Sequence, residues 1–185
     1  TLEAVEKKIA ALEGGVGAML TSSGQAATTI AIMNICHAGD HVVASSAIYG
    51  GSFNLLYKTL NDMGLEATFL KPDATEEEWN NAFRTNTKCV FAETLSNPSL
   101  VVLDIEMAAR VAHQHGVPLI LDNTFATPVH CRPFDFGADI ITHSTSKYMD
   151  GHAVSLGGVV VDGGRFDWNN GKFPMLTEPD ETYHG

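Results

Sequence analysis

Short apolar runs alternate with helical patterns along this 185-residue chain, and the alternation limits the folds that it can adopt. Two of the runs, residues 117–121 and 138–142, are apolar at almost every position instead of at every second one. Such a strand is buried on both faces, which is typical of a parallel sheet with helices on each side. The sequence therefore predicts a three-layer α/β domain with a mainly parallel sheet.

Periodicity and turn residues define the expected elements. Helices are expected at residues 2–12, 25–35, 53–63 and 105–115, and a further helix begins at the acidic run 76–78, capped by Asp73 or Thr75. Strands are expected at residues 16–21, 41–44, 66–70, 89–93, 117–121, 138–142 and 156–161. Residues 163–185 lose periodicity and are rich in Gly, Asn, Pro and Asp, which indicates an extended loop.

Composition argues against several other classes of protein. Acidic residues outnumber Lys plus Arg by 22 to 11, for a formal net charge of −11, so no basic surface for nucleic acid is expected. The chain has neither an apolar run of membrane-spanning length nor a signal peptide at its start, and we expect a cytoplasmic protein with no membrane contact. Cys36, Cys89 and Cys131 lack paired spacing, which argues against a disulfide framework or a zinc site. Each is expected to be a buried thiol.

The most informative polar residues follow two neighbouring expected strands, at the edge where α/β sheets bind ligands. Ser144-Thr145-Ser146-Lys147 offers two phosphate donors and an amine, and Asp122 follows residues 117–121 directly. Pyridoxal 5'-phosphate (PLP) uses a lysine for a Schiff base and an acid for its ring nitrogen. The alternatives are a polar loop with a surface lysine and, for Asp122, an Asp–Arg pair or a helix cap.

Other expected strands are followed by groups that suit the same ligand. Ser23-Gly24-Gln25 begins a helix, where free backbone N–H groups bind anions. Tyr49 can stack on a flat ring, the Asn97 amide can bond a ring hydroxyl, and Thr124 can contact the ring face. Each segment alone also fits an ordinary turn or loop.

Together these segments resemble the Cys/Met-metabolism family of PLP-dependent enzymes. The resemblance rests on Ser-Ser-Gly-Gln-Ala at 22–26, Tyr-Gly-Gly at 49–51, Asn97-Pro98, Asp-Asn-Thr-Phe-Ala-Thr-Pro at 122–128 and Ser-Thr-Ser-Lys-Tyr at 144–148. Within the family, the segments at 131–134, 164–174 and 176–180 and the end Tyr183-His184-Gly185 are most similar to O-acetylhomoserine sulfhydrylases. The family has the fold type I of the aspartate aminotransferase class, and the resemblance covers all 185 residues.

The resemblance implies a role for each of these residues. Lys147 would carry PLP and move protons, Asp122 would hold the ring nitrogen, and Tyr49 would stack on the ring. The phosphate would be held at the helix start 23–25 and by two hydroxyls, with two further residues near the ring: Ser23, Gly24, Gln25, Ser144, Ser146, Asn97 and Thr124. The implied reaction is a γ-replacement in which acetate leaves O-acetylhomoserine and sulfide adds, giving homocysteine.

Two other functions stay open. A related γ-lyase or γ-synthase would act on cystathionine or methionine, although Gly151-His152-Ala153-Val154 replaces the Gly-His-Ser-Asp usual in the lyases. A non-catalytic α/β module that binds a phosphorylated ligand or a partner is the alternative from another class.

The resemblance also implies an amino-acid substrate and a homo-oligomer, a dimer of dimers in the parent enzyme. In the family, an N-terminal arm supplies phosphate-binding Tyr and Arg residues to a neighbouring subunit. A C-terminal domain supplies the arginine for the substrate carboxylate. The sequence contains neither part, so residues 1–185 are expected to be an incomplete PLP-binding large domain.

Overall fold

The computed structural model of the chain describes residues 1–180 and 182, so the Tyr183-His184-Gly185 segment lies outside the described residues. Within the described part, seven strands form one sheet in the order β1-β7-β6-β5-β4-β2-β3. The strands are β1 (Gly17–Thr21), β2 (His41–Ser45), β3 (Glu66–Leu70), β4 (Thr87–Glu93), β5 (Leu119–Asp122), β6 (Ile140–His143) and β7 (Gly158–Asp162). The five strands from β6 to β3 are parallel, and β7 runs antiparallel to both of its neighbours, β6 and β1.

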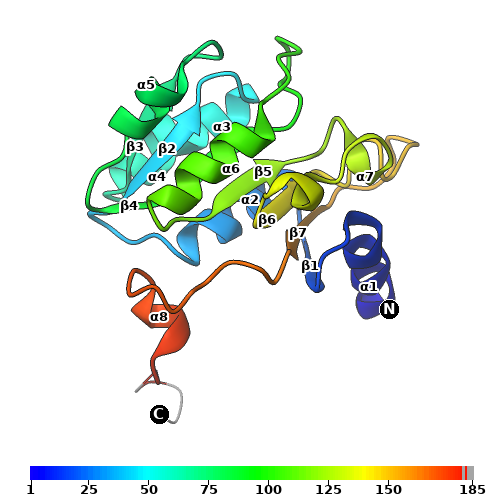
Figure 1. Cartoon of the computed structure of the whole chain (residues 1–185). Helices are drawn as coiled ribbons and strands as arrows, with labels where there is room; N and C mark the ends of the chain where they lie inside the picture. The colour runs from blue at the N-terminus through cyan, green and yellow to red at the C-terminus, as the bar shows by residue number, and fades with distance from the viewer. Residues whose placement is uncertain (181, 183–185) are drawn as a thin grey trace.

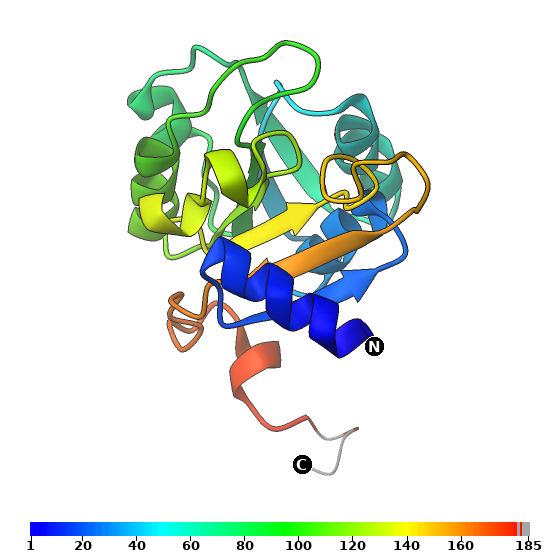
Figure 2. The ribbon, with the colours of Figure 1, turned by 90° about the vertical axis from the view of Figure 1, so that its right-hand side faces the viewer.

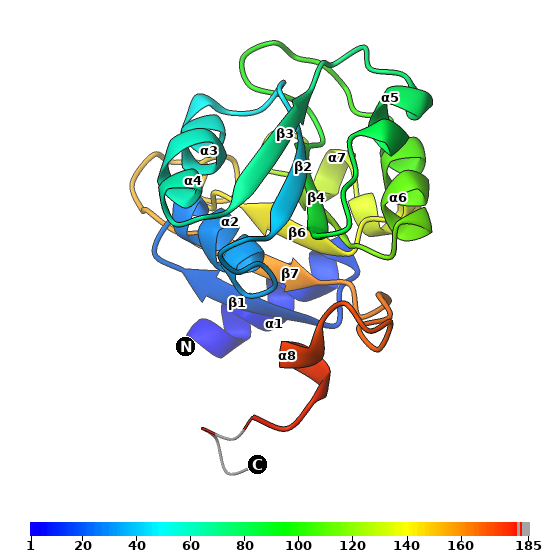
Figure 3. The same ribbon diagram turned by 90° about the vertical axis from the view of Figure 1, so that its left-hand side faces the viewer.

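Helices cover both faces of this sheet (Figure 1). They are α1 (Leu2–Glu13), α2 (Gly24–Met33), α3 (Gly50–Asn54), α4 (Leu60–Asp62), α5 (Glu76–Asn81), α6 (Ile105–Gln114), α7 (Thr127–His130) and α8 (Pro174–Thr177). A π-helical segment, Leu55–Thr59, joins α3 to α4, and a 3₁₀ turn spans Pro133–Phe136. Helices α2, α3 and α4 pack on one face and α1, α5 and α6 on the other (Figure 3). The predicted three-layer, mainly parallel fold is confirmed.

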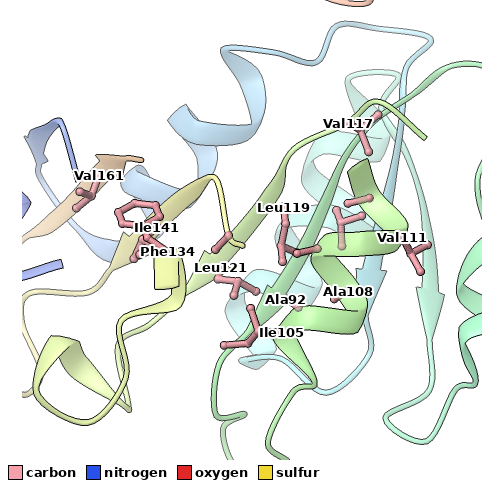
Figure 4. Packing of buried hydrophobic residues seen from close by; sticks show 14 of the residues in the cluster. Ala92, Ile105, Ala108, Val111, Val117, Leu119, Leu121, Phe134, Ile141 and Val161 are labelled. Atoms are coloured by element: carbon pink, nitrogen blue, oxygen red, sulfur yellow. The ribbon is translucent and has the colours of Figure 1, made fainter. Parts of the chain in front are cut away.

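The core on the α6 side holds the central strands in place. Leu119 and Leu121 of β5 are fully buried and lie against Ala108 and Val111 of α6 (Figure 4). Burying one such leucine contributes about 1.5–3 kcal/mol. This packing fixes the position of β5, whose last residue is Asp122.

Helix α1 lies beside β1 and β7 at the antiparallel end of the sheet (Figure 2). Ile9 and Ala10 are its buried apolar residues, and the helix ends at Gly14, whose φ of 80° is left-handed. Glycine adopts that conformation without strain, so Gly14 can end the helix. The last helical residue, Glu13, is fully buried although its side chain is polar.

The tail differs from the extended loop that its composition predicts. Phe173 is fully buried, and its ring packs edge-on against Phe166 and Trp168, with centroids 5.7 and 5.0 Å apart. Pro174 then begins the short helix α8, a position where its missing N–H costs nothing. Three aromatic residues spread over eight positions give no periodic pattern, which is why the sequence did not reveal this packing.

Other departures are small. Cys36 and Cys89 are buried as predicted, whereas Cys131 is only partly buried. The helix predicted at 53–63 begins at Gly50, because glycines at its start conceal the helical pattern. No helix within the described residues is both long and apolar enough to cross a membrane.

Strand direction brings one end of most strands to the same edge of the sheet. Because β1 and β6 are both antiparallel to β7, β1 points the same way as the parallel strands. The carboxyl ends of β1, β2, β4, β5 and β6 therefore share one edge, and the loop before β7 reaches the same place.

Candidate active site

A cleft lies at this edge, and all ten residues predicted from the sequence line it. They are Ser23, Gly24, Gln25, Tyr49, Asn97, Asp122, Thr124, Ser144, Ser146 and Lys147. Four further residues complete the lining of this central cleft: Glu93, Leu95, Phe125 and Leu156. Five separate loops thus contribute to one cavity of about 230 Å³.

The start of α2 forms one wall of the central cleft. Ser23 caps the helix, since its Oγ accepts a hydrogen bond from the backbone N–H of Ala26 (3.1 Å). The first N–H groups of a helix lack intrahelical acceptors and favour an anion. Gly24 and Gln25 therefore place a positive helix end at the cleft.

Gly24 also allows the first and last of these loops to touch. A Cβ atom at position 24 would lie 2.6 Å from Cβ and 2.8 Å from Cα of Ser144. Such distances are shorter than any ordinary van der Waals contact, so only glycine fits beside Ser144 without a shift of the backbone. The Ser23–Gln25 wall and the Ser144–Lys147 wall are consequently close enough to share one small anion.

We expect Gly24→Ala to separate these two walls and weaken phosphate binding at the cleft by about tenfold, the loss of one hydrogen bond to a charged group. Titration of the purified variant with PLP, followed by absorbance, measures the change. Gly17→Ala is the matched control, because a Cβ atom there meets nothing within 4 Å. Equal affinity of Gly24→Ala and the parent chain would show that the close approach does not matter.

Ser144 and Ser146 differ from the prediction in their backbone. The sequence suggested an extended chain with both hydroxyls on one side, but residues 145–150 form a turn. Both side chains still line the cleft, because the turn curls around it. The Oγ of Ser146 accepts a hydrogen bond from the N–H of Gly157 (2.9 Å) and donates to its carbonyl (3.2 Å). This exchange ties the lysine loop to the start of β7.

Lys147 lies within this turn and its side chain is exposed. It lines the same cleft as Asp122, which ends strand β5, the neighbour of β6. The Lys147 side chain, which follows β6, and the Asp122 side chain, which ends β5, thus line the same small cavity. This is the arrangement that the sequence predicts for the two groups.

Asp122 is held by the turn that follows it. Its Oδ1 accepts hydrogen bonds from the backbone N–H (2.9 Å) and the hydroxyl of Thr124, and the Thr124 hydroxyl accepts from the N–H of Ser144 (2.9 Å). Among the described residues neither an arginine partner nor a helix cap satisfies Asp122, so neither structural alternative applies. Thr124 forms hydrogen bonds that stabilise the turn after Asp122, so the alternative of an ordinary turn residue does apply to Thr124. Burial raises the pKa of Asp122, while the Thr124 bonds and the charge of His143 oppose the shift.

A buried polar cluster supports the cleft from behind. Oε1 of Glu13 pairs with His143 Nε2 and accepts a hydrogen bond from Asn123 Nδ2 (3.0 Å). All three side chains are almost fully buried. Since Asn123 precedes Thr124 and His143 precedes Ser144, Glu13 holds the backbone on both sides of the Thr124–Ser144 hydrogen bond.

Glu93 is the acidic residue that sequence reasoning missed. It ends β4, is 7% exposed, and is the direct neighbour of Asp122 in the parallel β4–β5 pairing. Its two carboxylate oxygens accept hydrogen bonds from the backbone N–H groups of Tyr49 (2.7 Å) and Asn97 (3.1 Å). The available signal was its place at the carboxyl end of a buried strand, the same signal that identified Asp122.

The chain is similar to a group of known proteins over its whole length. A family model described as "Cys/Met metabolism PLP-dependent enzyme" matches residues 1–177. O-acetyl-L-homoserine sulfhydrylases of Leptospira meyeri and Corynebacterium glutamicum are 46% and 49% identical in sequence to this chain. The matches cover 100% of this chain, but only 42% and 44% of the two sulfhydrylases. The chain therefore spans less than half the length of these curated relatives.

A solved structure gives the same result for the fold. A Campylobacter jejuni protein described as an O-acetylhomoserine (thiol)-lyase, with N'-pyridoxyl-lysine-5'-monophosphate at position 205 of its own chain, matches with a TM-score of 0.95. The identity is 36%, and the match covers 99% of this chain and 46% of that one. The sheet and its flanking helices are thus shared with a protein that carries the cofactor on a lysine.

Proposed function

Because the chain belongs to the Cys/Met metabolism family of PLP-dependent enzymes, we propose that residues 1–185 are the PLP-binding large domain of an O-acetylhomoserine sulfhydrylase. The reaction is a γ-replacement that releases acetate and joins sulfide to the four-carbon amino-acid skeleton, forming homocysteine. The observation that carries this proposal is the convergence of Lys147, Asp122 and Tyr49 on one cleft, in a chain 46% identical to such an enzyme.

The residues of the central cleft fit PLP. An anion fits the start of α2 beside Ser144 and Ser146, where Gly24 leaves room that any side chain would fill. A cation fits Asp122, because this acid has no positively charged side chain in contact among the described residues. PLP carries an anionic phosphate and a protonated ring nitrogen, and therefore suits both ends of the cleft.

Each residue then has a specific task. Bound PLP supplies an electron sink for carbanions of the amino-acid substrate. Asp122 Oδ2, the oxygen not bonded to Thr124, would accept a hydrogen bond from the protonated ring nitrogen. Lys147 Nζ is the amine that would hold the cofactor and then carry protons to and from the substrate. Tyr49, half exposed at the mouth, would lie against the ring while its hydroxyl stays in water.

The phosphate end depends on groups with fixed directions. Gly24 and Gln25 offer backbone N–H groups, and Ser144 offers its hydroxyl. The Ser146 proton, which now goes to the carbonyl of Gly157, can turn to a phosphate oxygen, because the N–H of Gly157 still anchors Oγ. Asn97 and Thr124 are proposed to lie near the ring.

Product analysis tests the reaction. The assay uses the complete protein in which these residues lie, with PLP, O-acetylhomoserine and sulfide. We expect homocysteine and acetate to form only when sulfide is present. Steady release of an α-keto acid and ammonia from cystathionine or methionine, without homocysteine formation from sulfide, would instead assign a γ-lyase. Tight binding of phosphorylated ligands without either product would favour a non-catalytic module.

We also propose a homo-oligomer located in the cytoplasm. Apolar side chains exposed on α1, on α7 and on the turn 145–150 support self-association: Leu2 (70%), Val5 (46%), Leu12 (50%), Val129 (80%) and Tyr148 (63%). Apolar patches of this kind on a domain mark contact surfaces. Light scattering of the purified chain is expected to give a mass above 19.8 kDa. A monomer at all concentrations would contradict this expectation.

A further inference from the structure

One acid joins two loops of the central cleft. Oε1 of Glu93 accepts the N–H of Tyr49, which follows β2, and Oε2 accepts the N–H of Asn97, which follows β4. Each oxygen thus holds one loop, at 2.7 and 3.1 Å respectively. Two hydrogen bonds accepted by one side chain fix the distance between the Tyr49 and Asn97 backbones, and they are charge-assisted when Glu93 is ionised.

The same acid stands beside a second one. Glu93 and Asp122 are paired across β4 and β5, and both face the cleft. Among the described residues no Lys, Arg or His forms an ion pair with either. Two neighbouring carboxylates at the end of a buried sheet are costly without a counter-charge.

The pKa of Glu93 reflects the cost of placing two acids side by side. Burial raises the pKa of Glu93 to about 7, and the charge of Asp122 adds to the rise. The N–H bonds from Tyr49 and Asn97 act in the opposite direction, because they favour the ionised form. Within residues 1–180 and 182, the other charged or titratable residues beside the pair are Lys147 and Tyr49, which line the cleft, and His143, which acts on Asp122.

We propose that Glu93 is a positioning residue, whose ionised carboxylate sets the Tyr49 and Asn97 loops on either side of the cofactor ring once a cation binds at Asp122. The inference rests on the proposed function in one respect, since the cation is the protonated ring nitrogen of PLP. That cation neutralises Asp122 and removes the like charge beside Glu93. Glu93 then releases its proton to solvent, and both of its oxygens become full acceptors for the two loops.

The affinity for PLP should depend on pH through Glu93. Glu93 has a pKa of about 7 in the empty cleft, and a cation at Asp122 lowers it. The part of the PLP affinity that depends on Glu93 is therefore fully present above about pH 7 and is lost as the pH falls through the lower value of the loaded cleft. Between these two values, PLP binding releases a proton.

The first test needs no cofactor. The folded chain keeps the Glu93 proton up to about pH 7, whereas an ordinary glutamate loses it near 4.5. The folded state therefore loses stability relative to the unfolded state as the pH rises between these values. We expect the urea midpoint of Glu93→Gln, compared with that of the parent chain, to shift upward between about pH 5 and about pH 8. Glu106→Gln, an exposed change on α6, is the control and should show no such shift.

The second test measures the positioning role. PLP titration of Glu93→Gln at pH 8 is expected to give about a tenfold higher Kd, because an amide cannot accept both N–H bonds. The induced circular dichroism of the bound cofactor should change, since the Tyr49 loop moves. Calorimetry in buffers of different ionisation enthalpy should show that proton release near pH 7 is lost. Glu93→Asp keeps the charge on a shorter side chain, so it should retain the proton release but not the affinity.

A purely structural role would give a different pattern. Glu93→Gln would then lose stability equally at all pH values, and PLP affinity would fall only as far as the fold does. That result, or unchanged affinity, dichroism and proton release, would overturn the inference. A parent chain that binds no PLP would instead contradict the proposed function, while the denaturation test still decides whether Glu93 carries the proton of the acid pair.

Discussion

Replacing Lys147 by Ala is expected to abolish covalent attachment of PLP, together with the visible absorbance band and the borohydride-stable adduct. The amine of Lys147 is the only lysine nitrogen among the residues that line the central cleft within the described chain. We expect PLP to be held only by its phosphate, through Gly24, Gln25 and Ser144, so dialysis should remove it faster than from the parent chain. Absorbance before and after dialysis measures both effects.

The matched control is Lys71→Ala. Lys71 is also an exposed lysine that follows the carboxyl end of a strand, β3, but it lies outside the central cleft. Its replacement should leave the band unchanged. If Lys147→Ala kept the band and Lys71→Ala lost it, the assignment of the central cleft as the PLP site would be wrong.

The second large effect is expected for Asp122→Asn. This change keeps the size of the side chain and one acceptor for Thr124, but it removes the charge that pairs with the ring nitrogen. A hydrogen bond to a charged group is worth about 1.5–3 kcal/mol, so PLP affinity should fall about 10- to 100-fold. Turnover should fall further, because an unprotonated ring stores electrons poorly. Equilibrium titration and the homocysteine assay measure the two losses separately.

Stability distinguishes this result from simple misfolding. Asp122 has a raised pKa because it is buried, so its charge opposes folding in the empty domain. Asp122→Asn should therefore unfold at the same urea concentration as the parent chain or at a higher one, although it binds PLP more weakly. Asp73→Asn, an exposed change on the loop after β3, is the control. Equal PLP affinity of Asp122→Asn and the parent chain would exclude an ion pair with the ring nitrogen.

The fold could be predicted from the sequence because its strands carry their own signal. The strand at 66–70 and the helix beginning at Ile105 were predicted to the residue, since apolar runs and the cap Asp104 mark them. Helix α7 and the packed tail were missed. Both depend on contacts between distant residues, of α7 with α1 and of Phe173 with Lys88, and not on local periodicity.

The candidate site, like the fold, was predicted only in part. A single rule, that ligands bind beyond the carboxyl ends of parallel strands, placed residues as far apart as Ser23 and Lys147 in one cleft. Four lining residues were not predicted, although Glu93, at the end of a buried strand, carries the same signal as Asp122: Glu93, Leu95, Phe125 and Leu156. The pairing of Glu93 with Asp122 becomes visible only when the register of β4 and β5 is known.

The most direct measurement is peptide mapping of the chain after incubation with PLP and reduction by borohydride. Reduction makes the link between the cofactor and its lysine permanent, so mass spectrometry identifies the residue. We expect one pyridoxyl group, on the peptide that contains Lys147. Labelling confined to other lysines, with the Lys147 peptide unmodified, would contradict it.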